Sequence, residues 1–149
     1  MNTKIMKLLF NLYPPYWGTG ISVSFISDDY QSIQVKMPLR FYNRNLVGSH
    51  FGGNLMSMTD PFLMVMLMKN LGRKYIVWDV ETHINFISPG KGTVYADFRL
   101  TESWLESIKN QISNKGESIR PKFEIPIYNS QGKTIASVKK TLYIKNTKG

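Results

Sequence analysis

One carboxylate, Asp60, lies inside an apolar stretch that runs from Phe51 to about Leu71. The nearest charged residue on its C-terminal side is Lys69. An unpaired charge is costly to bury, so a carboxylate in this position needs a reason. Asp60 is therefore the first residue for which a chemical role has to be considered.

A pair of glycines, Gly52 and Gly53, ends the short polar loop that precedes this stretch. Two glycines at the entrance of a helix allow a ligand to approach the backbone closely. They also leave the first N–H groups of the helix free to bind an anion or a developing oxyanion. The glycine pair is the second candidate for a functional site.

Two interpretations of the segment around Thr59-Asp60-Pro61 are open. In one, Asp60 is an N-cap and a helix begins at Pro61, so that residues 52–58 form a loop or a strand. In the other, a central helix covers residues 52–71, bends near Pro61 and is closed by Gly72 as a C-cap. The second interpretation places Asp60 about two turns from the N-terminus of the helix.

Further candidate residues surround the glycines. His50 could act as a base or a ligand, although a structural role is the alternative for both His50 and His83. Five of the eight methionines fall within the apolar stretch. Flexible thioethers suit an adaptable wall for an acyl chain, and filling gaps in the core is the alternative. These methionines are Met56, Met58, Met64, Met66 and Met68.

Composition narrows the chemistry that the chain can perform. With 149 residues it has the size of one domain. It contains no cysteine and two histidines. Disulfides and cysteine chemistry are thus excluded, and a histidine-rich metal site is not expected.

The formal net charge of +9 favours an anionic partner, such as nucleic acid, a membrane surface or a phosphate-rich cofactor. The basic residues are scattered without an aromatic–basic signature, so we expect no nucleic-acid binding.

No apolar run reaches the roughly 20 residues that span a bilayer, so we expect no membrane span. The apolar segment 5–13 lacks a small-residue cleavage site, which favours a cytoplasmic protein.

The elements that must position these residues follow from the hydrophobic pattern. Meandering strands around one long apolar helix predict an α+β domain. We expect strands at 20–26, 33–37, 76–86, 94–100, 123–127 and 134–144, and helices within 1–16, 52–71 and 101–115.

Four details of this pattern can be compared with a structure. The stripe Ile5, Leu8, Leu9 and Leu12 predicts a helix that packs on the domain, with contact to a membrane surface as the alternative. Strict alternation predicts that Ile76, Trp78, Val80, Thr82, Ile84 and Phe86 share one face of their strand. Pro126 suggests an edge strand. Lys140 interrupts the apolar face of the last strand.

The central stretch is similar to the active-site segment of the phenylacetate-degradation type of acyl-CoA thioesterases. These proteins have an Asn, a Gly three residues later, a His-Gly-Gly, and an Asp seven residues after the second Gly. Asn45, Gly48, Gly52-Gly53 and Asp60 have that spacing. At the position of the family's histidine this chain has Phe51, and His50 is displaced by one residue.

The whole chain also resembles a thioesterase-like hotdog family. The motifs that support this resemblance are 37–39, 49–53, 60–62, 75–79, 89–95 and 140–143. The resemblance implies a single hotdog domain over residues 1–149, in which a curved antiparallel sheet wraps around the central helix. It also implies a homodimer or a dimer of dimers, because such proteins share the site between two protomers.

The resemblance further implies hydrolysis of an acyl-CoA or acyl-carrier-protein thioester without a metal or other cofactor. The Gly53 N–H would polarise the thioester carbonyl, Asp60 would be the general base or the nucleophile, and Asn45 would orient water or the carbonyl. His50 is a secondary catalytic candidate. The substrate-binding candidates are Gly48, Ser49, Phe51, Gly52, Met56 and Met64. The alternative is a non-catalytic hotdog protein that binds acyl thioesters or a protein partner, which the Phe51 substitution favours.

Overall fold

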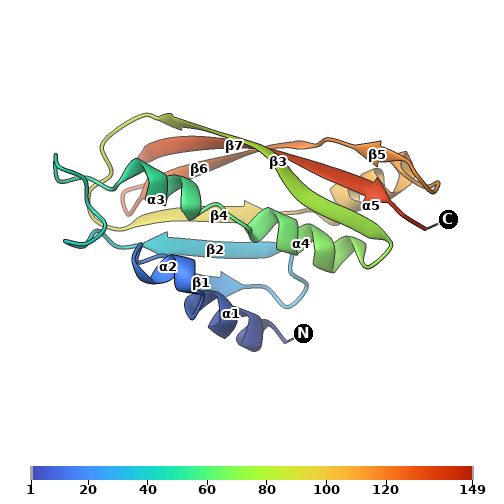
Figure 1. Ribbon diagram of the computed structural model, residues 1–149, viewed down its shortest axis with the longest axis horizontal. Helices are drawn as coiled ribbons and strands as arrows, with labels where there is room; N and C mark the ends of the chain where they lie inside the picture. Colours follow the sequence, from blue (N-terminus) through green and yellow to red (C-terminus); the bar gives the residue numbers. More distant parts are fainter. Residues whose placement is uncertain (1, 149) are drawn as a thin grey trace.

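A curved antiparallel sheet of seven strands forms the frame of the protein in the computed structural model, which describes residues 2–148 (Figure 1). Met1 and Gly149 of the predicted domain lie outside the described residues. The strand order is β1-β2-β4-β6-β7-β3, and β5 pairs with β7. The strands are β1 Ser22–Ile26, β2 Ser32–Met37, β3 Tyr75–Phe86, β4 Val94–Arg99, β5 Ser118–Ile119, β6 Lys122–Asn129 and β7 Thr134–Asn146.

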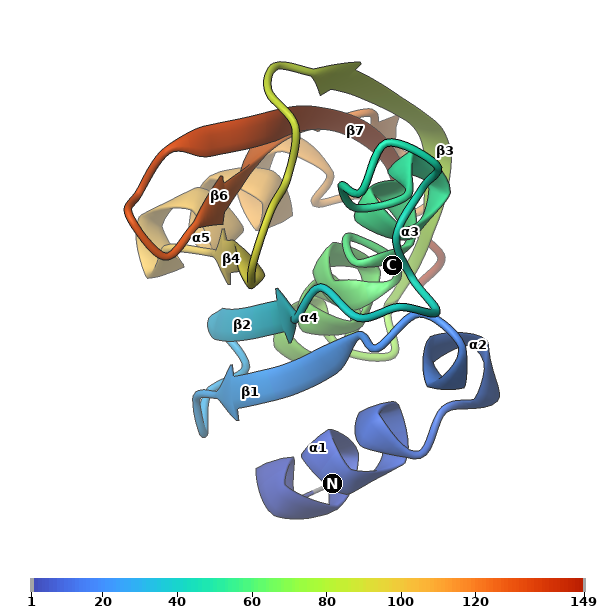
Figure 2. The ribbon, with the colours of Figure 1, turned by 90° about the vertical axis from the view of Figure 1, so that its left-hand side faces the viewer.

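Two consecutive helices occupy the inside of the curved sheet, which bends around them in the end-on view (Figure 2). They are α3, Gly52–Ser57, and α4, Phe62–Leu71. Three further helices are α1, Thr3–Asn11, α2, Pro14–Trp17, and α5, Glu102–Gln111. The arrangement confirms the predicted α+β class and the hotdog fold.

The central helix is interrupted, which corrects both interpretations of Thr59-Asp60-Pro61. Residues 52–58 are neither loop nor strand, because α3 begins at Gly52 and has Met58 as its C-cap. Asp60 is not an N-cap, because α4 begins at Phe62 and its N-cap position is Pro61, with no side-chain cap bond. The continuous helix 52–71 is therefore two helices joined by a turn that contains Asp60. The predicted end is confirmed, since the N–H of Gly72 donates to the carbonyl of Met68.

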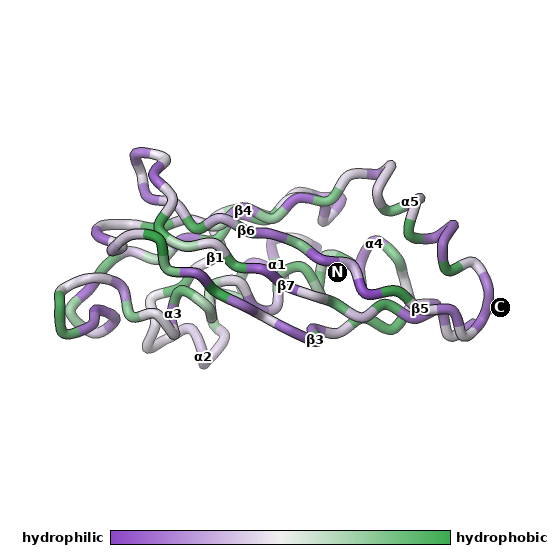
Figure 3. The backbone as a smooth tube through the Cα atoms, turned by 90° about the horizontal axis from the view of Figure 1, so that it is seen from above, coloured by the Kyte–Doolittle hydropathy of each residue, from purple (hydrophilic) through white to green (hydrophobic). Residues whose placement is uncertain are grey.

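The core lies between the sheet and α4. Hydrophobic and hydrophilic residues alternate along the strands, so that one face of the sheet can be buried (Figure 3). Phe62 is fully buried at the start of α4. Its ring centroid lies 5.1 Å from that of Phe10 and 5.3 Å from that of Phe98, and its ring stacks on Tyr16. Phe62 therefore connects the N-terminal helices, the central helix and the sheet.

The N-terminal helix packs on the domain through a face other than the predicted stripe. Met6 and Phe10 of α1 are buried, and Asn11 accepts a hydrogen bond from the backbone of Val23 in β1 at 2.7 Å. The face that carries these three residues packs on β1, so the apolar stripe points outward. The four residues of the stripe, Ile5, Leu8, Leu9 and Leu12, are each more than half exposed. Within residues 2–148, no helix is long and apolar enough to cross a membrane.

A β-bulge breaks the predicted alternation of β3. The register with β7 shifts between Asp79 and Glu81, because a bulge places one extra residue on one strand. Ile76, Trp78 and Val80 are consequently exposed, whereas Ile84 packs against the core. The predicted single face is therefore wrong.

Two further expectations concern β6 and β7. β6 is an interior strand between β4 and β7, so the predicted edge position is wrong. Its pairing with β4 nevertheless ends at Ile127, one residue beyond Pro126. On β7, Lys140 is buried on the same face as its apolar neighbours Val138 and Leu142. This face is continuous, and the lysine is part of it.

Candidate functional site

The loop before α3 is held in place by one buried asparagine. Asn43 is 1% exposed. Its amide donates to the carbonyls of Thr19, at 2.8 Å, and Pro38, at 2.9 Å, and its oxygen accepts from the N–H of Arg40, at 2.7 Å. These three bonds fix the path of the chain from β2 to Phe51, whose N–H donates to the Asn43 carbonyl.

Replacing Asn43 by alanine is expected to lower the free energy of unfolding by about 3 kcal/mol, because it removes a buried side chain that bonds three backbone groups. Urea denaturation followed by circular dichroism measures the change. The matched control is Asn85→Ala, at an exposed asparagine of β3. Equal midpoints for the two variants would contradict the role given to Asn43.

Asn45 organises the turn that follows. Its side-chain oxygen accepts from the N–H of Val47, at 3.1 Å, and of Ser49, at 3.0 Å, and its amide donates to Ser49 Oγ at 2.9 Å. Gly48 completes the turn with φ +78°, a conformation that favours glycine. The hydrogen-bonding capacity of Asn45 is thus largely used within its own turn.

His50 is 3% exposed beside the turn. Its Nε2 lies 2.8 Å from the carbonyl oxygen of Gly92, which can only accept, so Nε2 carries the proton. Nδ1 is then an acceptor, and among residues 2–148 it has no hydrogen-bond partner. Burial lowers the pKa of the His50 imidazole, and the bond to Gly92 opposes that change. His50 is consequently a neutral group with one unused acceptor.

Aromatic rings cover both glycines at the start of α3. A Cβ on Gly52 would lie 2.8 Å from the Phe86 ring, and a Cβ on Gly53 would lie 2.7 Å from the Phe51 ring. Within the described part of the chain, no group accepts a hydrogen bond from the N–H of Gly52 or Gly53. The glycines therefore provide two free N–H groups with aromatic rings packed against them.

A cavity of about 420 Å³ opens next to these groups. It brings together the predicted residues Asn45, Ser49, His50 and Gly52, and it does not include Asp60, Gly53, Gly48, Phe51, Met56 or Met64 in its lining. The complete lining is Asn45, Ser49, His50, Gly52, Leu55, Phe86, Ile87, Ser88, Pro89 and Gly90. Within one chain, the candidate residues that line the cavity are therefore separate from Asp60.

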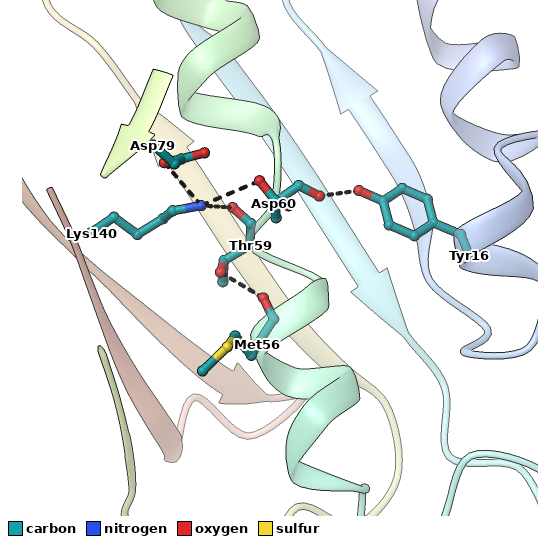
Figure 4. Close-up of polar contacts among 6 residues, drawn as sticks. All are labelled: Tyr16, Met56, Thr59, Asp60, Asp79 and Lys140. Carbon is teal, nitrogen blue, oxygen red and sulfur yellow. Dashed lines mark hydrogen bonds and ion pairs between the residues drawn. The ribbon is translucent and has the colours of Figure 1, made fainter. Parts of the chain in front are cut away.

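Asp60 belongs to a cluster of charges at the other end of α3 (Figure 4). Its side chain is 64% exposed, and its Oδ1 lies 3.6 Å from the Nζ of Lys140, which is 1% exposed. The same ammonium group donates to the backbone oxygen of Thr59 at 3.2 Å. Lys140 thus contacts the turn between α3 and α4 at two consecutive residues.

Asp79 of β3 is the second carboxylate of this cluster. Its Oδ1 lies 3.2 Å from Lys140 Nζ, within ion-pair distance. That oxygen is buried and has no partner of hydrogen-bonding geometry among residues 2–148. Burial raises the pKa of the Asp79 carboxyl, Lys140 counteracts the rise, and Asp60 adds to it. At the β3 bulge immediately after Asp79, Val80 and Glu81 are both exposed, and Ile84 beyond it packs against the core.

Tyr16 of α2 holds the turn from the opposite side, where its hydroxyl donates to the backbone oxygen of Asp60 (Figure 4). Burial raises the pKa of Tyr16, and the negative charge of Asp60 adds to that effect. Both the backbone and the side chain of Asp60 therefore have partners from distant parts of the chain.

The sequence did not identify Lys140, Asp79 or Tyr16 as site residues. The available signal was a single lysine on an otherwise apolar strand face, which requires a buried counter-charge.

The predicted methionines divide between core and surface: Met58 and Met66 are fully buried, and Met56 and Met68 are exposed. Within residues 2–148, no group of three or more His, Asp or Glu side chains is placed to hold a metal ion.

Comparisons with known proteins agree with this fold. A family model described as "Domain of unknown function (DUF4442)" matches residues 2–144. No curated protein matches the chain.

Several solved structures are similar over nearly the whole chain. A Pseudomonas aeruginosa protein described as a "probable thioesterase" is 16% identical, with a TM-score of 0.84 over 98% of this chain and 97% of its own. A Haemophilus influenzae thioesterase is 16% identical, with a TM-score of 0.70 over 98% and 92%. A Chlorobaculum tepidum protein of unknown function is 18% identical, with a TM-score of 0.75 over 97% and 94%. The predicted resemblance to hotdog-fold, thioesterase-like proteins is confirmed.

Proposed function

We propose that this chain, which belongs to the family described as a domain of unknown function (DUF4442), hydrolyses acyl thioesters of coenzyme A or of an acyl-carrier protein. The observation that carries the proposal is the exposed carboxylate of Asp60, which a buried lysine contacts in the turn between the two central helices. The thioesterase descriptions of proteins with the same fold support it.

In the proposed reaction, Asp60 acts on the thioester carbonyl carbon either through water or directly. In the direct route its carboxylate displaces the thiolate to form a mixed anhydride, which water then hydrolyses to the free acid and the carboxylate. As a general base it accepts a proton from water while the water oxygen bonds to the carbonyl carbon. The free N–H groups of Gly52 and Gly53 stabilise the negative oxygen that develops. The C–S bond then breaks, and the thiolate leaves and takes up a proton. The products are the free acid and the thiol.

We further propose that the site is completed in a homodimer or a dimer of dimers. The cavity beside the glycines does not include Asp60 within one chain, whereas the Asp60 side chain is largely exposed. A second protomer could therefore bring its Asp60 to the glycines of the first. The net charge of +9 suits the phosphates of coenzyme A.

A non-catalytic acyl-thioester-binding protein is the second candidate function. The observation that favours it is the Phe51 ring, which packs against Gly53 at the position of the family's histidine. Such a protein would use the same cavity to hold the thioester without turnover.

Hydrolysis of a panel of short, long and aromatic acyl-CoAs tests the proposal. Thiol release is measured with a chromogenic thiol reagent, and the mass of the protein in solution is measured in parallel. We expect saturable release from at least one member of the panel. No release from any member, together with saturable binding in calorimetry, would replace hydrolysis by the binding function.

A further inference from the structure

Lys140 is the only lysine that is buried among the residues that the structure describes. It occupies the core face of β7 between Val138 and Leu142, where an apolar side chain would avoid the cost of removing an ammonium group from water. The neighbouring strands β6 and β3 pair with β7 at this residue, opposite Phe123 and Thr82. The base of the side chain is therefore fixed on both sides.

The contacts of the ammonium group go beyond simple neutralisation. Asp79 at 3.2 Å already provides a counter-charge that is only 22% exposed. The two remaining contacts go to Asp60 and to the carbonyl of Thr59, the residue before it. Lys140 thus connects the sheet to the turn that presents the candidate base.

The contact with Lys140 leaves the Asp60 carboxylate open to solvent. Lys140 approaches Oδ1 at 3.6 Å, and the Asp60 side chain is 64% exposed. A carboxylate that is held on one side and open to water on the other can accept a proton from water. Tyr16 restrains the same residue through its backbone oxygen.

Building on the proposed function, we propose that Lys140 is a positioning residue for Asp60. Its buried ammonium group, shared with Asp79, keeps the carboxylate oriented while the carboxylate receives the proton of the attacking water. The titratable groups that face the cluster are Asp60 from the turn, Asp79 from β3 and Tyr16 from α2.

Three variants of β7 test this role on the full-length protein, with the acyl-CoA that the wild type hydrolyses fastest. Lys140→Met removes the charge and retains an unbranched apolar chain, whereas Lys140→Arg retains the charge. Lys139→Met makes the same change at the neighbouring exposed lysine and is the matched control. The values of kcat and KM are measured from about pH 5 to pH 9, after circular dichroism has confirmed folding.

We expect Lys140→Met to lower kcat by roughly tenfold to a hundredfold with KM nearly unchanged, as for a displaced catalytic group. Lys140→Arg should retain most of the rate, and Lys139→Met should match the wild type. A folded Lys140→Met variant with the wild-type kcat would overturn the inference.

A loss of rate that Lys140→Arg does not restore would also overturn it, since that result indicates packing alone. If Lys140→Met does not fold, Asp79→Asn provides the test. Asp79→Asn keeps the contact between Lys140 and Asp60, so kcat should stay within about threefold of the wild type. A folded Asp79→Asn variant whose kcat falls tenfold or more at unchanged KM would overturn the inference. A wild type without turnover on any thioester would instead overturn the proposed function, and this inference with it.

Discussion

Replacing Asp60 by asparagine is expected to lower kcat for thioester hydrolysis at least about a hundredfold, the usual contribution of a general base. An amide keeps the size of the side chain but cannot accept the proton of water. KM should change by less than about twofold, because the interaction is made in the transition state. The variant should fold, since Lys140 retains Asp79 as a counter-charge at 3.2 Å.

The measurement is steady-state thiol release by the variant and the wild type. Glu106→Gln is the matched control, since it converts an exposed carboxylate of α5 into an amide and should leave both constants unchanged. Substrate binding by calorimetry shows whether the cavity is intact. If the variant keeps a tenth or more of the wild-type kcat, Asp60 is not the general base of the reaction.

Replacing Phe62 by alanine is expected to lower the free energy of unfolding by about 3–5 kcal/mol, the range for a large aromatic side chain deleted from a core. The ring is fully buried and contacts Phe10, Tyr16 and Phe98. Its removal leaves a cavity where α1, α2, α4 and the sheet meet. These elements cannot all move inward to fill it.

Urea denaturation at neutral pH measures this effect. Phe41→Ala is the control, because Phe41 is 82% exposed and its loss should change stability by less than about 0.5 kcal/mol. The start of α4 carries the turn that contains Asp60, so the variant should also lose activity at temperatures below its unfolding transition. A loss of stability below 1 kcal/mol would contradict the central place given to Phe62.

The strands, the central apolar segment and the α+β class could be predicted from the hydrophobic pattern of the sequence, and the hotdog arrangement was implied by the family resemblance. The outward stripe of α1 could not be predicted. Hydrophobic spacing places Ile5 and Leu8 on one face, whereas the helix packs through Met6 and Phe10, and Asn11 bonds to β1 beside them. The β3 bulge could not be predicted either, since strict alternation continues through Val80 in the sequence.

The candidate site was predicted in part. Asn45, His50 and Gly52, which the resemblance grouped as candidate site residues, line one cavity. Asp60 was identified from the cost of a lone carboxylate, but its partner was not. Lys140 lies 80 positions along the chain, and only the pairing of β7 with β3 brings it to Asp79 and the turn. A contact made across the sheet leaves no local pattern in a single sequence.

The walls of the cavity and the charged cluster come from different kinds of structure. Much of the wall belongs to the loops before α3 and after β3, whereas Lys140 and Asp79 are built into paired strands. Loops accept substitutions and insertions more readily than paired strands do. Residues of the cavity wall can therefore vary among descendants of this protein more readily than Lys140 and Asp79 can.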